Sequence, residues 1–355
     1  MTLKIIIPKF AQVLILSLLV FKPALAEDVK VVGTLVHPLK QNNIHSIKNT
    51  EKQIQLLQLE LSNDEKNYLA LQAKNVQNHK DPFLETSPTI ENSPLPTSAQ
   101  LGMNKVPVLD QGSHGTCVTF AVTGALDAII GKGDYFSQLC NLQLGKYLEI
   151  HGQGYSGWNG SYPMNVISQI SQYGLMNMTN QRKSGCGGLT EYPTHNLLTG
   201  QSMEPEQFSL NSELVFGKSA NWSEAFHNRQ PVINLNEVKQ AIHAGDRLTF
   251  AVMLPRIDLG TIGTLGKYKT WFYYDTWLLT PEIIEGLRTV KAGHEMIITG
   301  YDDNALATDN LGKKHKGLLK LRNSWGTSVG DYGEFYMSYD FFKLLSYDLK
   351  RFSSN

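Results

Sequence analysis

The chain has 355 residues, in which 32 Lys and Arg balance 32 Asp and Glu and 41% of the residues are hydrophobic. This neutral balance argues against nucleic acid, or an anionic membrane surface, as a partner bound mainly by charge. The composition is that of a folded globule, because 18% charged residues is too few for a largely disordered chain. The three cysteines are too few for a disulfide scaffold, and they form no CxxC pair, so we do not expect a thiolate metal site. We also expect no cofactor.

Residues 1–26 have the layout of a cleavable secretory signal. Lys4 and Lys9 precede a mostly apolar run at 10–21, and the small-residue tripeptide Ala24–Ala26 follows. A chain cut there begins at Glu27 and is exported: secreted, periplasmic or, in a eukaryote, delivered to a lysosome-like compartment, without stable membrane insertion. An uncleaved membrane anchor is the alternative, although the apolar run is short for a bilayer.

The segment 27–94 is predicted to be separate from the rest of the chain. Residues 29–36 have the pattern of a short strand, and residues 44–76 that of an amphipathic helix, in which Ile47, Ile54, Leu61 and Tyr68 recur at intervals of seven. The stretch 81–104 has the proline-rich composition of a linker. Residues 27–94 are therefore either a pro-region or a permanent docking segment with an amphipathic helix and a Pro/Ser-rich linker.

From residue 95 to 355 the chain alternates helical and strand-like patterns, as expected of one domain. Within it, residues 195–236 are polar and lack strong periodicity, so we expect an insertion or a long surface excursion there.

Cys117 is predicted to begin a helix. Gly112 and Gly115 precede it, the apolar residues after it have helical spacing, and Gly131 provides a stop, with Thr116 as the expected cap. At a helix N-terminus the free backbone N–H groups favour a thiolate, which lowers the pKa of a nucleophilic cysteine. A buried structural cysteine is the alternative.

A histidine and an asparagine near the carboxyl end complete a candidate triad. His294 stands at the start of a predicted strand at 296–301, and a second strand, at 318–322, runs directly into Asn323. A thiolate needs an imidazolium partner, which also protonates the leaving group. The Asn323 amide can orient the imidazole ring, and Trp325 can shield that hydrogen bond from water.

In these motifs the chain resembles the papain family of cysteine peptidases. The matching residues are Gln111, Gly112, Gly115 and Cys117, then Gly293-His294 with Gly300-Tyr301, then Asn323-Ser324-Trp325-Gly326. Leu95-Pro96 resembles the start of mature family enzymes, and Asn159, Gly160, Tyr162 and Pro163 resemble the substrate cleft. The resemblance implies an α+β fold of two lobes, a helical lobe with the cysteine and an antiparallel, β-barrel-like lobe with the histidine and asparagine, and an active site in the cleft between them.

The resemblance also implies roles for these residues. Cys117, His294 and Asn323 would be the catalytic triad of a cysteine-type peptidase, a hydrolase, and Gln111 would form the oxyanion hole together with the Cys117 N–H. Trp325, Asn159, Gly160 and Ser161 would support the triad or the substrate cleft. Proteins or peptides would be the substrates, with the chain's own N-terminal segment as an intramolecular inhibitor. A catalytically inactive protein that uses the papain fold for binding is the alternative.

Three departures from the family pattern stand out. His114 and Trp158 occupy the two positions that the family joins by a disulfide, and this paired change predicts a contact between the two side chains. Ser161 replaces the substrate-pairing glycine. The separations from Cys117 to His294 and Asn323 exceed the roughly 130 to 150 residues typical of the family. Longer surface segments, including residues 259–291, can account for that excess.

Cys140 and Cys186 remain. In an exported protein they are candidates for a disulfide, and two buried thiols are the alternative. Side-chain specificity, and the choice between endopeptidase and exopeptidase action, do not follow from these patterns.

Overall fold

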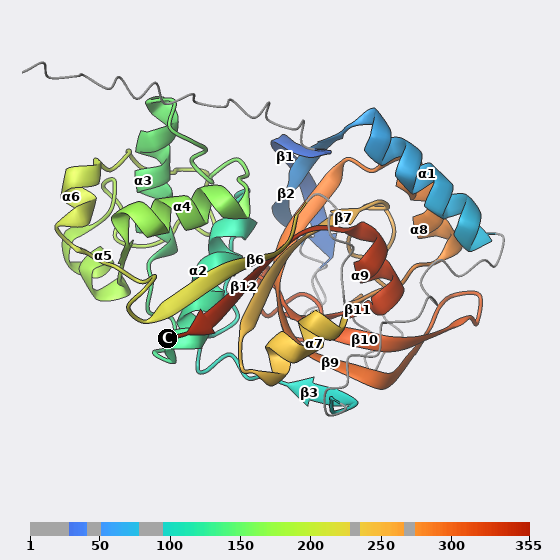
Figure 1. Ribbon diagram of the computed structural model, residues 1–355. Helices are drawn as coiled ribbons and strands as arrows, with labels where there is room; N and C mark the ends of the chain where they lie inside the picture. Colours follow the sequence, from blue (N-terminus) through green and yellow to red (C-terminus); the bar gives the residue numbers. More distant parts are fainter. Residues whose placement is uncertain (1–27, 41–50, 78–94, 228–234, 266–273) are drawn as a thin grey trace, which may run out of the picture.

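The computed structural model describes residues 28–40, 51–77, 95–227, 235–265 and 274–355 (Figure 1). The predicted secretory signal lies outside the described residues, as do residues 44–50 of the predicted helix and most of the predicted linker. None of the described helices is long and apolar enough to cross a membrane.

One lobe is built on a sheet that has ten strands in the described residues. The strand order is β6-β12-β7-β9-β10-β11-β8. In addition, β3 and β2 (Glu51–Leu61) pair with β9, and β1 (Val29–Lys40) pairs with β2. All pairs are antiparallel except β11 with β8, and this path does not close into a barrel within the described chain. The strands are β3 (Ser98–Gln100), β6 (Ala220–His227), β7 (Arg247–Leu254), β8 (Thr276–Trp277), β9 (Ala292–Thr308), β10 (Lys314–Arg322), β11 (Glu334–Ser338) and β12 (Ser346–Ser354).

The other lobe is mostly helical and has a core of its own. Its elements are α2 (Cys117–Ile130), α3 (Gln138–Ile150), α4 (Pro163–Tyr173), β4 (Leu175–Met176), α5 (Met178–Ser184), α6 (Pro205–Ser209) and β5 (Ser212–Glu213). Leu139, Leu142, Trp158 and Phe208 belong to this separate buried cluster. Helix α2 also contacts β7, β9 and β12, so it joins the helical lobe to the sheet (Figure 1). The predicted α+β, two-lobe architecture is therefore present.

Four short helical segments accompany the sheet. They are α7 (Leu235–His243), α8 (Pro281–Gly286), the 3-10 turn η1 (Leu287–Thr289) and α9 (Tyr339–Leu345). The strands predicted at 296–301 and 318–322 are confirmed, and they extend to form β9 and β10.

The helix predicted over residues 44–76 is wrong for its central part. Residues 51–61 form a strand, β2 (Glu51–Leu61), which pairs antiparallel with β1 (Val29–Lys40). The spacing of the apolar residues between 54 and 61 is compatible with both a helix and a strand. The long-range pairing with β1 and β9 therefore determines that this segment is a strand. Only α1 (Asn63–Gln77) is helical. Ser62 caps it by accepting the Glu65 N–H at 3.0 Å.

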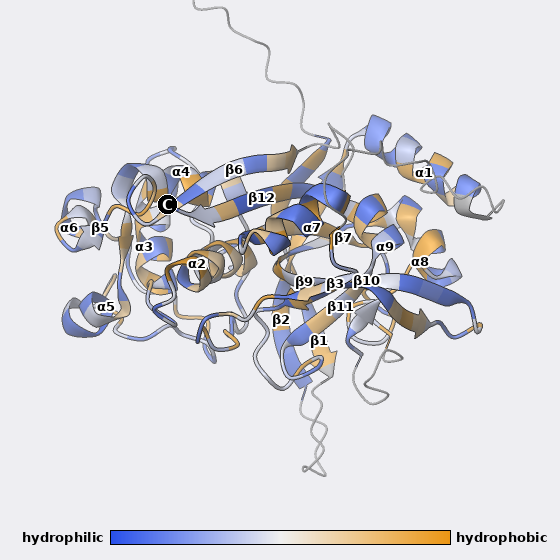
Figure 2. Ribbon diagram, turned by 60° about the horizontal axis from the view of Figure 1, so that its bottom comes forward, coloured by the Kyte–Doolittle hydropathy of each residue, from blue (hydrophilic) through white to orange (hydrophobic). Residues whose placement is uncertain are grey.

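Helix α1 lies on the sheet lobe, beside α8 and η1. Its buried residues include Leu69 and Ala73, whereas Leu71 is exposed. Figure 2 shows hydrophilic and hydrophobic residues mixed along this helix, as expected of an element with one packed side.

Two further predictions need correction. Residues 98–100, predicted as linker, form β3 and pair with residues 300–302 of β9. Residues 220–227, predicted as part of a surface excursion, form the edge strand β6, which pairs with β12. In both segments a neighbouring strand supplies the backbone partners that local composition cannot reveal.

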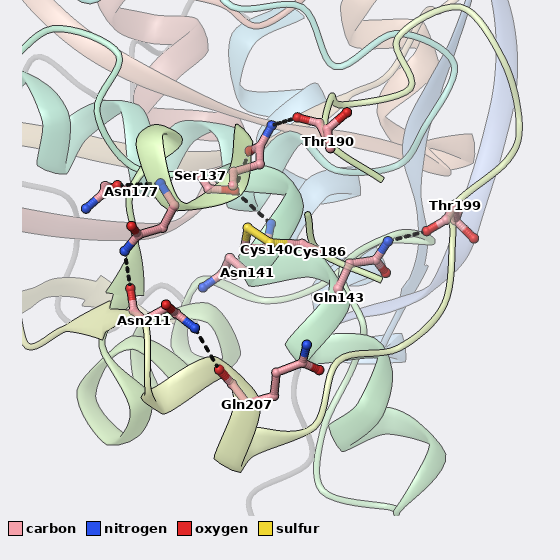
Figure 3. The surroundings of a disulfide bond; sticks show 12 residues. Ser137, Cys140, Asn141, Gln143, Asn177, Cys186, Thr190, Thr199, Gln207 and Asn211 are labelled. Carbon is pink, nitrogen blue, oxygen red and sulfur yellow. Dashed lines mark hydrogen bonds between the residues drawn. A yellow bond between two sulfur atoms is a disulfide. The ribbon is translucent and has the colours of Figure 1, made fainter. Parts of the chain in front are cut away.

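Cys140 and Cys186 form a disulfide within the helical lobe (Figure 3). Both residues are buried in that lobe's core, and the bond ties α3 to the loop after α5. Of the three cysteines, all of which are described, Cys117 alone carries a free thiol.

Candidate active site

Cys117 is the first residue of α2, as predicted, and Gly131 ends the helix in a left-handed conformation with φ 70°. Thr116 is the N-cap residue, as predicted, but it does not cap the helix through its side chain. The Thr116 side chain makes no capping hydrogen bond, because its hydroxyl lies 2.9 Å from the hydroxyl of Tyr192. The Cys117 thiol lies near the backbone amides of Val118 and Glu295, so it reaches from the helical lobe to β9.

His294 lies on β9 and is paired with Asn323, the residue after β10. The His294 Nε2 donates to the Asn323 Oδ1 at 2.7 Å, so Nδ1 carries the lone pair. This Nδ1 is buried and has no hydrogen-bond partner among the described residues. Trp325 stacks on the imidazole with ring centroids 4.4 Å apart and is fully buried. The indole therefore covers one face of the imidazole that makes the His294–Asn323 hydrogen bond.

Gln111 lies between the two lobes. Its Oε1 accepts from the Ser324 hydroxyl at 2.8 Å, and its backbone N–H donates to the Ser324 carbonyl at 2.8 Å. Its Nε2 donates to the carbonyls of His114 and of Gln55, at 2.8 and 3.3 Å. Ser324 therefore fixes the amide orientation, a role that the sequence analysis did not assign.

The predicted cleft segment lies beside Cys117. The Gly115 N–H donates to the Trp158 carbonyl at 2.9 Å, and Gly115 and Asn159 form a parallel bridge. Gly160 has a φ of 96°, which favours glycine. Asn159 is exposed and Ser161 is buried.

His114 and Trp158 are in contact, as their paired change predicted. Their ring centroids lie 4.9 Å apart in an edge-to-face arrangement. The Tyr192 ring stacks on the Trp158 ring, with the two centroids 5.7 Å apart. The His114 Nε2 also lies 3.0 Å from the Pro193 carbonyl. An aromatic cluster therefore occupies the position of the disulfide that the family pattern would place there.

The hairpin of β1 and β2 lies over this site, between the two lobes (Figure 1). On one side β2 pairs with residues 292–293 of β9, directly before His294. On the other side the Val31 N–H donates to the Tyr162 hydroxyl at 2.7 Å. The Lys52 ammonium pairs with Asp110 and donates to the Trp325 carbonyl at 3.0 Å.

Close packing of the hairpin covers three glycines around the site. A methyl group on Gly115 would lie 2.3 Å from the Thr34 methyl, and one on Gly160 would lie 3.2 Å from the Gly33 carbonyl oxygen. A methyl group on Gly293 would lie 2.8 Å from Leu59. The close atoms are hairpin side chains at Gly115 and Gly293 and include the Gly33 backbone carbonyl at Gly160, so a larger residue at these positions requires the hairpin to shift.

Burial sets the protonation of Cys117 and His294. Cys117 and His294 are fully buried. Burial raises the pKa of Cys117 to about 12, although nearby backbone amides oppose this shift. Burial lowers the pKa of His294 to about 4. The lowered thiol pKa expected from the helix N-terminus is therefore wrong for this covered form, because loss of solvent outweighs the amides.

Several residues around the site carried no role in the sequence analysis. Lys52 and Gln55 contact it from the hairpin, and Glu295 follows His294 on β9. The sequence offered one indication of these residues: Glu295 is an acidic residue at the start of an otherwise apolar strand pattern. No local pattern could bring residues 52–55 to Gln111.

No family model matches the chain, and no curated protein matches it significantly. Among solved structures it is similar to xylellain, a cysteine protease from Xylella fastidiosa, with 16% identity and a TM-score of 0.49 over 74% of this chain and 87% of that one.

It is also similar to digestive procathepsin L 3 of the Tenebrio molitor larval midgut, with 17% identity, a TM-score of 0.44, and coverage of 81% and 78% of the two chains. A third similar structure is the bromelain protease of Ananas comosus, with 14% identity, a TM-score of 0.44, and coverage of 74% and 99%.

Proposed function

We propose that this protein is an exported cysteine peptidase that hydrolyses peptide bonds in proteins or peptides, and that the form described is its latent precursor. The observation that carries the proposal is the set of contacts around His294. The His294 Nε2 is hydrogen-bonded to Asn323, and Trp325 stacks on the imidazole ring. The His294 Nδ1 has no hydrogen-bond partner among the described residues, and the Cys117 thiol lies near the backbone amide of the next residue, Glu295.

In the proposed acylation the Cys117 thiol proton moves to the His294 Nδ1. The thiolate then attacks the substrate carbonyl, forming a carbon–sulfur bond and a tetrahedral oxyanion. The Gln111 Nε2 and the Cys117 N–H donate to that oxyanion. When the intermediate collapses, the carbon–nitrogen bond breaks and the His294 imidazolium protonates the departing amine.

In the proposed deacylation His294 takes a proton from water, whose oxygen attacks the thioester carbonyl. Collapse of the second tetrahedral intermediate releases the carboxylic acid, and the thiolate recovers its proton from His294. Asn323 holds the ring in the same orientation throughout, so one imidazole nitrogen exchanges every proton.

The hairpin contacts support latency. The Gln55 carbonyl accepts from the Gln111 Nε2, the group that would otherwise receive the substrate oxyanion. The hairpin also covers Gly115 and Gly160 and pairs with β9 beside His294. A substrate chain needs the same backbone groups, so it competes with the hairpin. In this proposal residues 27–94 act as an inhibitory pro-region rather than a permanent docking segment.

Alkylation of Cys117 in the full-length protein tests the enzyme assignment. Labelling by iodoacetamide should follow opening of the hairpin. Corrected for the open fraction at each pH, its rate should vary little between pH 6 and 8, and it should slow at least tenfold in His294→Ala, because the imidazolium stabilises the thiolate. His315→Ala is the matched control, since that histidine lies on β10 beside Asp309 and Asp340. Labelling no faster than that of a free thiol, after correction for the open fraction, would favour the inactive binding protein.

Sequencing of the N-terminus of the active form tests the role of residues 27–94. A start near Leu95 supports an inhibitory segment that is removed. A start at Glu27 supports both export and a permanently attached segment, and it would contradict the proposed precursor.

A further inference from the structure

Glu295 is a buried acid that the proposed chemistry does not use. It follows His294 on β9 and is fully buried, and neither carboxylate oxygen has a hydrogen-bond partner among the described residues. Burial, and after it the charge of Asp348, raises the pKa of Glu295 well above its usual range, against smaller opposing effects of Thr249 and Lys350. The carboxyl is therefore neutral in this covered form.

A small cavity of about 10 Å³ lies against this residue. Glu295, Tyr347 and Asp348 line it from the sheet, and Val118, the residue after Cys117, lines it from the helical lobe. The cavity therefore lies immediately beside the proposed nucleophile. A second cavity between α2 and β9 also borders Glu295. The neighbours that influence the carboxyl, however, lie on β7 and β12, on the side of the first cavity.

The hairpin fills this space with apolar side chains only. Val29, Val31 and Leu57 line the same cavity, and all three are buried. No described group of the hairpin supplies the hydrogen bonds that the Glu295 carboxyl lacks. A buried carboxyl without partners is unfavourable unless it stays neutral, so the apolar hairpin holds Glu295 protonated.

The surrounding charges favour a cation over an anion. Asp348 pairs with the Lys350 ammonium at 2.9 Å, and that ammonium also lies 3.1 Å from Glu224. The buried Lys350 ammonium is therefore already shared by two carboxylates. Ionised Glu295 adds a further negative charge without a cation of its own, and the Tyr347 hydroxyl has no hydrogen-bond partner in the described residues.

We infer that this cavity, once the hairpin leaves, is a specificity pocket for a lysine or arginine side chain of the substrate, whose cation pairs with Glu295. The inference rests on the proposed function. The incoming cation stabilises the carboxylate, the Glu295 proton passes to solvent, and the apolar stem of the substrate side chain replaces Val31 against the walls of the pocket.

Fluorogenic peptides that carry arginine, citrulline or leucine at each position in turn test the pocket with the full-length protein. Citrulline matches arginine in shape but has no charge. The ratio of kcat/KM between two peptides does not depend on the fraction of molecules with an open hairpin. At one position we expect arginine to exceed citrulline by about 10- to 100-fold, the effect of one buried hydrogen bond to a charged group.

The Glu295→Gln variant should bring that ratio close to one, and Glu295→Asp should restore part of it. Glutamine is a close mimic of the neutral carboxyl present in the covered form, so the variant is expected to fold. Absence of a preference for arginine at every position, or the same preference in Glu295→Gln, would overturn the inference.

A stability measurement tests the pocket without any turnover. Val31→Lys places an ammonium beside Glu295, whereas Val32→Lys, at a half-exposed position of the same strand, serves as the matched control. Val31→Lys should lower the Tm by fewer degrees in the wild-type background than in Glu295→Gln. Val32→Lys should change the Tm equally in both backgrounds.

Equal shifts for Val31→Lys in the two backgrounds would show that Glu295 receives no cation. This readout separates two failures. If no peptide is cleaved in a Cys117-dependent way, the peptidase assignment fails, and the Tm comparison still decides whether Glu295 pairs with a cation.

Discussion

The Gln111 side chain donates its Nε2–H to the backbone carbonyl of Gln55, 3.3 Å away. One residue belongs to the loop before Cys117 and the other to the N-terminal hairpin. The Gln55 carbonyl therefore accepts a hydrogen bond from the same amide group that is proposed to stabilise a substrate oxyanion. The same hairpin packs against Gly115 and Gly293, close in sequence to Cys117 and His294, and both of these residues are fully buried.

Lys52→Ala should loosen the hairpin. The Lys52 ammonium pairs with Asp110, donates to the Trp325 carbonyl and is only 11% exposed. Hydrogen bonds to charged groups contribute about 1.5 to 3 kcal/mol each, so the open fraction, and with it the rate of Cys117 alkylation, should rise about 10- to 100-fold. Lys30→Ala, at an exposed position on the hairpin, should leave the rate within about twofold. Equal alkylation rates for the two variants would show that the Lys52 contacts do not hold the hairpin in place.

Acid should favour opening of the hairpin. The pKa of His294 is lowered to about 4 in the covered form, and an exposed histidine titrates near 6.5. Because the open form binds a proton more readily, the stability of the covered form is present above pH 6.5 and is lost as the pH falls toward 4. Between pH 7 and pH 5 the open fraction should rise on the order of tenfold.

Hydrogen exchange of the β1 and β2 amides, corrected for intrinsic rates, measures this opening. His294→Ala should remove most of the acid response. An unchanged response in that variant would assign the effect to other groups.

Gln111→Ala should lower kcat by about 100- to 1000-fold, the usual effect of removing one oxyanion donor. Ser324→Ala should have a smaller effect, on the order of tenfold, because its hydroxyl orients the Gln111 amide but does not reach the substrate. Steady-state kinetics with a peptide substrate separates kcat from KM. A loss confined to KM in Gln111→Ala would contradict the oxyanion role.

Removal of the disulfide should destabilise the helical lobe. Cys140 and Cys186 are separated by 46 positions in the chain. A loop of that size corresponds to about 4 kcal/mol in the loop-entropy model. The Cys140→Ala, Cys186→Ala double variant should therefore unfold at a Tm lower by several degrees in a calorimetric scan. Thiol titration of the unfolded, unreduced protein should find one free thiol in the wild type; three would exclude the disulfide.

Local patterns were sufficient for several parts of the site. The helix that begins at Cys117, the strand that carries His294 and the strand that leads into Asn323 could all be predicted, because periodicity and glycine positions are short-range properties. The paired replacement of two cysteines also predicted the contact between His114 and Trp158.

The sequence by itself determined which residues carry the candidate chemistry, because their order and their flanking residues are encoded locally. Only the tertiary structure decided that residues 51–61 form a strand and that this strand packs against Gly160, Gly293 and Gln111 around the site. Its hydrogen-bond partners lie far along the chain, on β1 and β9. The protonation of Cys117 and His294 depends on their burial, because burial removes the water that would stabilise their charged forms.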